Sequence, residues 1–217
     1  MRVLFVTLSI VVADQVTKLV VKGLAIPSLG IHWEGMRYGS SIPVLGDFLR
    51  WTYIENSGMA FGIDPGGGKF FFSIFSIIAS IAILIYLYKA RNESLTLRLP
   101  LAMILGGAVG NLIDRMFYGL FFEGGSLFTG RVVDFIDVDF FNINFLGIHI
   151  SRWPVFNIAD ASVTVGVILL LLFSHKVMRD KEPLTLSDSP RNEPIQFTPS
   201  SSDIVTAQEH SNPDRHI

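Results

Sequence analysis

Four long apolar segments constrain this chain more than any other feature of its sequence. They cover residues 3–21, 70–88, 99–118 and 155–173. A helix needs about 20 apolar residues to cross a hydrocarbon core of about 30 Å, so each segment is long enough to span a membrane. Only 17% of the residues are charged, against about 25% in soluble domains. The sequence therefore predicts an integral membrane protein, mainly α-helical, with four transmembrane helices.

The ends of these segments predict an orientation. Lys and Arg collect before the first segment, in the short loop 89–98, and after the fourth segment at residues 176–181. Under the positive-inside rule this side faces the cytoplasm, so both termini are expected there. The first segment contains charged residues, unlike the short uncharged core of a signal peptide, so it is expected to be retained.

The two longer connections, expected outside, contain strand-like sequence. Residues 48–55 read F-L-R-W-T-Y-I-E and are followed by the turn signal Asn56-Ser57-Gly58 and an apolar run at 59–63. This predicts a small extramembrane β-hairpin or sheet between helices one and two. Residues 131–138 read R-V-V-D-F-I-D-V and predict a second short strand.

The composition changes near residue 180, after which Pro, Ser, Asn, Asp and Glu dominate. Such a segment buries too little apolar surface to fold, so residues 180–217 are predicted to be a disordered cytoplasmic tail. Residues 1–179 are expected to form the four-helix membrane domain.

Several chemistries have no support in the sequence. There is no cysteine, which excludes a thiol nucleophile and a cysteine zinc site. The net charge of −2 provides no basic surface for nucleic acid. The five histidines are scattered without H-E-x-x-H, and no G-x-S-x-G elbow occurs. No metal and no cofactor are predicted.

Three of the apolar segments carry polar side chains. In the first, Asp14 and Lys18 are four residues apart, next to Gln15, and are expected to pair as a structural ion pair.

The third segment contains G-G-A-V-G-N-L-I-D-R. Its Gly106 and Gly110 have the small-xxx-small spacing that lets another helix approach closely. Asn111, Asp114 and Arg115 follow, and their spacing predicts one polar face.

A carboxylate in the fourth segment is the strongest indication of a functional site. Asp160 is expected one to two turns inside the helix, with Asn157 on the same face. Asp134, in the preceding connection, can reach the same depth. Two adjacent carboxylates can share a proton and serve as general acid and general base. Asp137 and Asp139 compete with Asp134 for this role. Strand alternation puts Asp134 and Asp137 on opposite faces, but the pattern does not choose between them.

Two other functions fit the same residues. Paired aspartates in membrane helices also relay protons in carriers and channels, although no inverted repeat is visible here. A non-enzymatic membrane scaffold would need neither aspartate.

Five motifs together resemble one family, the lipoprotein signal peptidases, or bacterial type II signal peptidases. In order, the motifs start at residues 14, 56, 106, 132 and 156: D-Q-V-T-K, N-S-G-M-A-F-G, G-G-A-V-G-N-L-I-D-R, V-V-D-F-I-D and F-N-I-A-D-A. The resemblance implies an aspartyl endopeptidase of the bacterial inner membrane with its site near the outer face. It would cleave diacylglyceryl-modified prolipoproteins before the lipidated cysteine.

The resemblance also implies roles for individual residues. Asp134 and Asp160 match the catalytic dyad, and Asp137 does not. Residues that match the substrate-binding, site-lining set are Asn56, Gly58, Asn111, Arg115 and Asn157, and those that match a supporting set are Asp14, Lys18 and Asp114. Membrane lipid and prolipoprotein are the implied partners. One chain would hold a complete site, so a monomer is expected. Small residues at 106–110 and 160–162 are expected to leave room for a substrate helix.

Overall fold

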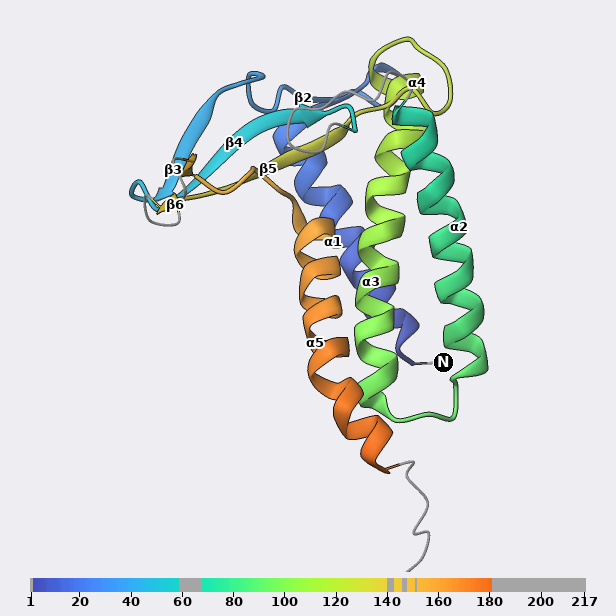
Figure 1. Cartoon of the computed structure of the whole chain (residues 1–217). Coiled ribbons are helices and arrows are strands. Elements are labelled where there is room, and N and C mark those ends of the chain that lie inside the picture. The colour runs from blue at the N-terminus through green and yellow to red at the C-terminus, as the bar shows by residue number, and fades with distance from the viewer. Residues whose placement is uncertain (1, 59–67, 140–142, 146–147, 151, 181–217) are drawn as a thin grey trace, which may run out of the picture. The chain divides into compact units, whose positions relative to one another are not determined.

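The computed structural model describes residues 2–58, 68–139, 143–145, 148–150 and 152–180 (Figure 1). The helices are α1 (Leu4–Lys22), α2 (Gly68–Lys89), α3 (Leu95–Ile113), α4 (Gly119–Phe122) and α5 (Ile158–Asp180). A π-helical turn, η2 (Asp114–Tyr118), joins α3 to α4. The tail predicted from residue 180 lies outside the described residues, apart from Asp180 itself, the last residue of α5.

Three helical stretches are long and apolar enough to cross a membrane, namely Leu4–Lys22, Phe72–Lys89 and Leu95–Phe122. They correspond to the first three predicted spans. The apolar part of α5, Ile158–Phe173, is shorter. A multi-pass membrane protein is therefore well supported by the described helices.

The glycines of α3 allow close contact with two neighbouring helices. A Cβ on Gly106 would lie 2.9 Å from the Ile10 Cβ in α1, and one on Gly107 would lie 2.2 Å from the Ala159 carbonyl oxygen in α5. A Cβ on Gly110 would lie 2.7 Å from an Asp14 oxygen. The predicted close approach is confirmed. The expectation that these positions leave room for a substrate helix is wrong, because α1 and α5 already occupy the space.

The same correction applies on the α5 side of this contact. The Ser162 hydroxyl is buried, donates to the Ala159 carbonyl at 2.8 Å, and would lie 2.6 Å from a Cβ on Gly107. Its small size serves helix packing.

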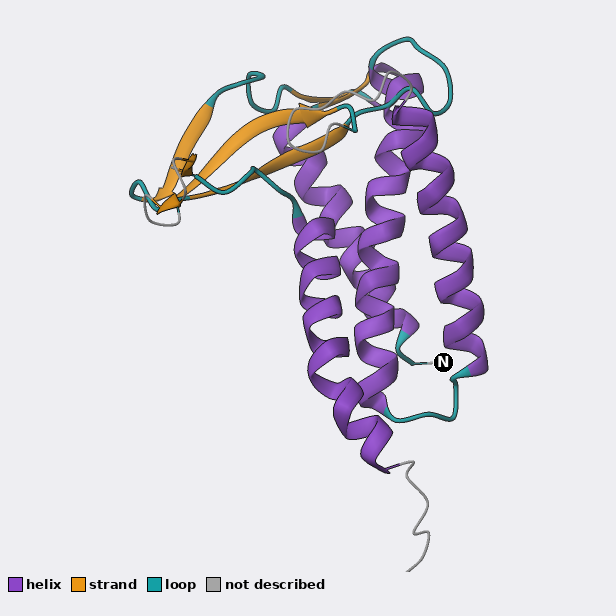
Figure 2. Ribbon diagram, in the orientation of Figure 1, coloured by secondary structure: helices purple, strands orange, loops and turns teal. Residues whose placement is uncertain are grey.

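The strands form three small antiparallel sheets (Figure 2). One hairpin pairs β1 (Leu24–Ile26) with β2 (Ile31–Trp33), and a 3₁₀ turn, η1 (Pro27–Leu29), connects the two strands. Another hairpin pairs β6 (Ile143–Phe145) with β7 (Ile148–Ile150). The central sheet has the order β3 (Ser41–Leu45), β4 (Leu49–Asn56), β5 (Val132–Val138).

Both predicted strands are confirmed, but their pairing differs from the prediction. The sheet does not belong only to the connection between helices one and two, because β5 comes from the connection that precedes α5 and pairs with β4. The apolar run 59–63, expected to continue the hairpin, lies outside the described residues. Long-range backbone pairing decides which strands meet, and local sequence does not encode it.

A buried apolar cluster joins the central sheet to the helix ends. Val21 of α1 and Tyr118 of η2 pack with Tyr53 of β4 and with Val133 and Phe135 of β5. All five side chains are at least 94% buried. Asp134 lies between two of these core residues, so the cluster holds its backbone in place.

The start of α5 differs from the predicted span. The helix begins at Ile158, and not near residue 155, because Phe156 still pairs with Ile136 of β5 as an antiparallel bridge. Asp160 is therefore the third helical residue, in the first turn, and not one to two turns inside the helix. Asn157 precedes the helix and does not share a helical face with Asp160.

Candidate active site

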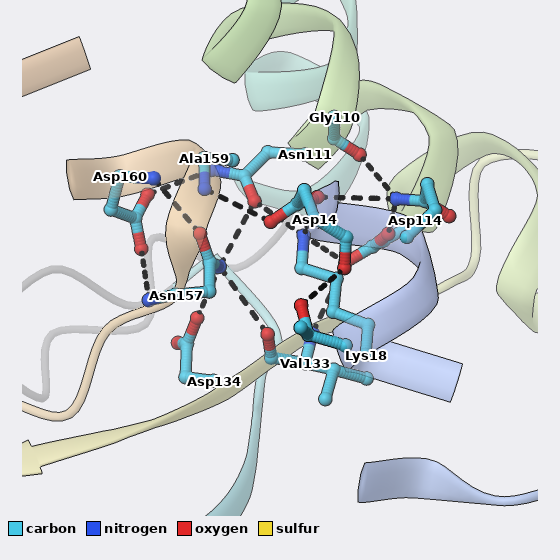
Figure 3. Close-up of polar contacts among 12 residues, drawn as sticks. Asp14, Lys18, Gly110, Asn111, Asp114, Val133, Asp134, Asn157, Ala159 and Asp160 are labelled. Atoms are coloured by element: carbon cyan, nitrogen blue, oxygen red, sulfur yellow. Dashed lines mark hydrogen bonds and ion pairs between the residues drawn. The ribbon is translucent and has the colours of Figure 1, made fainter. Parts of the chain in front are cut away.

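Asn157 connects the two aspartates that the sequence analysis selected. Its side chain is fully buried, and its Nδ2 donates to Asp134 Oδ1 at 2.6 Å. The same amide group donates to Asn111 Oδ1 at 3.1 Å and to the Val133 carbonyl at 3.3 Å. Figure 3 shows Asn157 between Asp134 and Asp160. β5 and the start of α5 thus bring the two carboxylates to one residue, Asp134 to the side-chain amide of Asn157 and Asp160 to its backbone N–H.

Asp160 is surrounded by hydrogen-bond donors. Its Oδ1 accepts from Asn111 Nδ2 at 2.7 Å, and its Oδ2 accepts from the backbone N–H of Asn157 at 3.3 Å. It also lies in the first turn of α5, where the helix dipole favours negative charge. These hydrogen bonds fix the orientation of the Asp160 carboxyl group.

Asp134 is more deeply buried than Asp160. Only 3% of the residue is exposed. Burial, and then the negative charge of Asp160, raise the pKa of the Asp134 carboxyl from 3.8 to about 8. The carboxyl is therefore protonated at neutral pH. The two carboxyls therefore differ in their surroundings: Asp134 is buried and holds a proton, whereas Asp160 accepts hydrogen bonds at the start of a helix.

A second polar cluster lies next to the dyad, centred on Lys18. The Lys18 ammonium is fully buried and has three donor hydrogens. It contacts Asp14 Oδ2 at 2.8 Å, Asp114 Oδ2 at 2.8 Å and Asn111 Oδ1 at 2.9 Å. The predicted Asp14–Lys18 ion pair is confirmed, and Asp114 joins it.

The Lys18 cluster also contacts the backbone beside each aspartate of the dyad. Asp14 Oδ1 accepts from the Ala159 N–H at 2.9 Å, one residue before Asp160. Asp114 Oδ2 accepts from the Val133 N–H at 3.2 Å, one residue before Asp134. The buried charges thus hold both chain segments that carry the dyad.

Gln15 also belongs to this cluster, although it was not among the predicted site residues. Its Nε2 donates to Asp114 Oδ1 at 2.8 Å and to the Gly110 carbonyl at 3.1 Å, and its Oε1 accepts from the Tyr118 hydroxyl at 3.1 Å. The sequence feature that could have identified Gln15 is a polar amide next to Asp14 within an apolar membrane segment.

Arg115 does not share the contacts of Asn111 and Asp114. Its guanidinium lies over the Phe72 ring of α2, 5.9 Å from the ring centre. It also interacts electrostatically with Asp160 and Asp134. Arg115 and Asn111 thus both interact with Asp160, Asn111 through a hydrogen bond and Arg115 through its charge.

Asn56 and Gly58 form a turn at the end of β4. The Gly58 N–H donates to Asn56 Oδ1 at 2.8 Å, and Gly58 has a φ of 98°, which favours glycine. In the sheet register Asn56 is opposite Val132, two residues from Asp134. The network around Asn157 described above does not include this turn.

Asp137 has partners of its own. Its Oδ2 accepts from Arg152 Nη1 at 2.6 Å and from the Thr52 hydroxyl at 2.6 Å. Asp139 is 3.6 Å from Arg152 Nη2. These contacts distinguish both competitors from Asp134, which contacts Asn157. Within the described residues, no group of three or more His, Asp or Glu side chains is arranged to hold a metal ion.

Comparisons with known proteins agree with this architecture. The lipoprotein signal peptidase of Chlorobium phaeobacteroides (strain DSM 266) is 32% identical over 172 residues, covering 79% of this chain and 89% of that protein. The lipoprotein signal peptidase of Chlorobaculum tepidum is 36% identical over 183 residues, covering 82% and 98%. A bacterial membrane enzyme solved in meso at 2.3 Å resolution superposes with a TM-score of 0.62 at 32% identity, covering 85% of this chain and 94% of that one. A family model described as "Signal peptidase (SPase) II" matches residues 6–176. The chain therefore belongs to the signal peptidase II family.

Proposed function

We propose that this protein is an aspartyl endopeptidase that removes the signal peptide from diacylglyceryl-modified prolipoproteins. It cuts the peptide bond before the lipidated cysteine, with Asp134 and Asp160 as the catalytic pair. The names of its relatives support the substrate class. The observation that carries the aspartyl mechanism is the inequivalence of two carboxylates that meet at Asn157.

The environments of the two aspartates suggest their roles. Asp160, oriented by its donors from Asn111 and Asn157, acts as general base and takes a proton from a water molecule. The hydroxide equivalent attacks the scissile carbonyl carbon. Asp134 is protonated and donates its proton to the carbonyl oxygen as the tetrahedral intermediate forms. Asp160 then returns the proton to the leaving amide nitrogen and the carbon–nitrogen bond breaks, while Asp134 takes a proton back from one hydroxyl of the intermediate, which gives the new carboxyl group and restores both aspartates.

Polar residues around the pair position the substrate in this proposal. Asn111 and Asn157 orient the carboxylates, and Arg115 is close enough to interact with their charge. Asn56 and Gly58, on the turn after β4, bind the extended peptide. Asp14, Lys18 and Asp114 support the site through the Asn111 side chain and the backbone at Val133 and Ala159.

The proposed setting is the bacterial inner membrane. The chain crosses it four times, with α5 as the fourth span and both termini in the cytoplasm. The site then lies near the outer face, where the acyl chains of a lipidated cysteine hold the scissile bond. The chain acts as a monomer, with membrane lipid and prolipoprotein as partners, and residues 180–217 form a tail outside the peptidase domain.

A gel-shift assay tests the proposal with purified protein and a diacylglyceryl prolipoprotein. The wild type should convert the precursor to a shorter product, whereas Asp134→Asn and Asp160→Asn should leave it uncut. Glu34→Gln is the control, because Glu34 is an exposed carboxylate in the connection between α1 and α2. It should cleave normally.

Three outcomes separate the alternatives. A wild type that is inert toward the lipidated precursor contradicts the peptidase assignment. Full cleavage by either dyad variant contradicts the aspartyl mechanism. Proton flux in proteoliposomes that depends on both aspartates, without cleavage, would instead identify a proton-coupled carrier.

A further inference from the structure

The backbone next to the dyad forms an additional strand pairing whose register determines where Asn157 lies. On one side, β5 pairs with β4. On its other side, Phe156 and Ile136 exchange both backbone hydrogen bonds, at 3.0 and 2.7 Å. The Trp153 N–H also donates to the Val138 carbonyl at 3.2 Å. Residues 153–156 therefore lie along β5 and lead directly into Asn157.

This pairing is short, so its backbone hydrogen bonds define the register only weakly. The only described residues that pair as an isolated bridge are Ile136 and Phe156. A slip by one residue would move every following side chain to the opposite face. The Asn157 side chain would then point away from Asp134, and the hydrogen bond between them would be lost.

Arg152 anchors the outer end of this pairing. Its Nη1 donates to Asp137 Oδ2 at 2.6 Å, and its Nη2 donates to the Asp47 carbonyl at 2.9 Å. Asp139 adds an ion pair at 3.6 Å. One guanidinium thus connects the segment before Asn157 to β5 and to the turn between β3 and β4. A planar fork of donors is suited to such a connection, and a lysine is not.

Asp137 is the main partner of this anchor. Its side chain is 8% exposed, whereas that of Asp139, the other carboxylate paired with Arg152, is 36% exposed. Charge pairs are screened less when they are buried, so the Arg152–Asp137 pair carries most of the interaction. Asp137 is on β5 three residues after Asp134, on the same strand as one half of the dyad.

We infer that Arg152 is a positioning residue: by pairing with Asp137 it sets the register of residues 153–157 on β5 and so places Asn157 and Asp160 against Asp134. The inference rests on the proposed peptidase function. Arg152 has no contact with the reacting groups. Its loss displaces the dyad without removing either carboxylate.

The first experiment compares variants in the gel-shift assay, with kcat and KM measured separately. Arg152→Ala should lower kcat on the order of 100-fold, the effect of misplacing catalytic groups by about 1 Å, with KM nearly unchanged. Arg152→Lys should recover part of the loss. Arg50→Ala is the matched control, because Arg50 is opposite Asp137 in the register but pairs with the exposed Asp47 carboxylate. It should keep the wild-type kcat.

A double variant without either charge separates loss of positioning from loss of folding. Arg152→Ala leaves Asp137 buried without its cation, whereas Arg152→Met combined with Asp137→Val removes both charges. The double variant should fold and should still show the low kcat. A wild-type kcat in the folded double variant would overturn the inference.

A crosslink tests the register directly. The chain has no cysteine, so Ile136→Cys with Phe156→Cys creates one designed pair. A hydrogen-bonded antiparallel pair has a Cα separation of about 5.5 Å, within the range that a disulfide spans. In the Arg152→Ala background, oxidation should restore kcat and reduction should abolish it again. The same crosslink in a protein that retains Arg152 is the control and should not lower kcat. If that control is active but the crosslinked Arg152→Ala protein is not restored, the positioning role is overturned. An inert wild type would instead contradict the peptidase function itself.

Discussion

Asn157 and Asp160 hydrogen-bond each other in both directions at the start of α5. The Asp160 N–H donates to Asn157 Oδ1 at 2.9 Å, and the Asn157 N–H donates to Asp160 Oδ2 at 3.3 Å. This is the geometry of a capping box, with Asn at the N-cap and Asp at the third helical position. The carboxylate proposed as general base therefore also caps its own helix, and the helix start positions it.

Two substitutions at Asp160 should separate capping from catalysis. Asp160→Asn retains an oxygen acceptor for the Asn157 N–H, whereas Asp160→Ala removes it. Both variants should lose cleavage, but only the alanine variant should lose about 1 kcal/mol of unfolding free energy, the usual contribution of a cap. Thermal unfolding in detergent measures the difference. Equal unfolding temperatures would show that the reciprocal pair adds no stability.

The pKa of Asp134 predicts an alkaline limit to activity. Catalysis as proposed requires a protonated Asp134, and burial together with the charge of Asp160 raises its pKa to about 8. The value of kcat/KM should therefore fall as the pH rises through about 8. Rates measured between pH 6 and pH 10 check this, and a flat profile would exclude Asp134 as the acid.

The same shift predicts a pH dependence of stability. The folded pKa of Asp134 is above its ordinary value of 3.8, so the native state holds this proton more tightly than the unfolded state does. The stabilisation is complete below pH 3.8 and is lost as the pH rises toward about 8. Asp134→Asn cannot titrate, so this part of the decline should be missing from its unfolding curves. An identical decline in wild type and variant would contradict the shifted pKa.

Lys18 is expected to be essential for folding. Lys18→Met leaves Asp14 and Asp114 buried without a cation, which should destabilise the protein by roughly 3–5 kcal/mol. Adding Asp14→Asn and Asp114→Asn should restore much of that stability. Lys89→Met is the matched control, because Lys89 is exposed at the end of α2. Thermal unfolding of the wild type and the three variants gives the comparison, and a stable Lys18→Met protein would contradict the prediction.

Gly107 should be intolerant of a side chain. An alanine Cβ would lie 2.2 Å from the Ala159 carbonyl oxygen, so Gly107→Ala must displace the start of α5 beside Asp160. Overpacking of this kind costs about 1–3 kcal/mol and should also lower the cleavage rate. Gly46→Ala meets no atom within 4 Å and adds only strain at φ 54°, so it should cleave normally. Equal cleavage rates for Gly107→Ala and the wild type would show that α5 can move away from α3 at little cost.

Removal of the tail should not impair cleavage. The family match ends at residue 176, and α5 ends at Asp180. A chain that stops after Lys181 should therefore have wild-type kcat and KM in the gel-shift assay. A loss of more than about tenfold, equivalent to 1.4 kcal/mol, would assign the tail a role at the site.

Local patterns in the sequence predicted much of the architecture. Apolar runs of about 20 residues indicated the first three helices, since the hydrocarbon thickness sets their length. The β-branched and aromatic runs indicated β4 and β5, and four-residue spacing indicated the Asp14–Lys18 pair. These features depend on neighbours within about two helical turns, so they can be read from the chain in order.

Tertiary structure alone decided how the site is assembled. Strand pairing brought β5 beside β4 and beside Phe156, which moved the start of α5 to Ile158 and made Asn157 a cap. The same pairing put Asp134 next to Asn157, while Arg152 and Thr52 engaged Asp137. Burial, which no local pattern specifies, raised the pKa of Asp134 to about 8. The amino-acid sequence by itself determined which carboxylates were available, and the packing of distant segments determined which two meet, because hydrogen bonds and desolvation act through space.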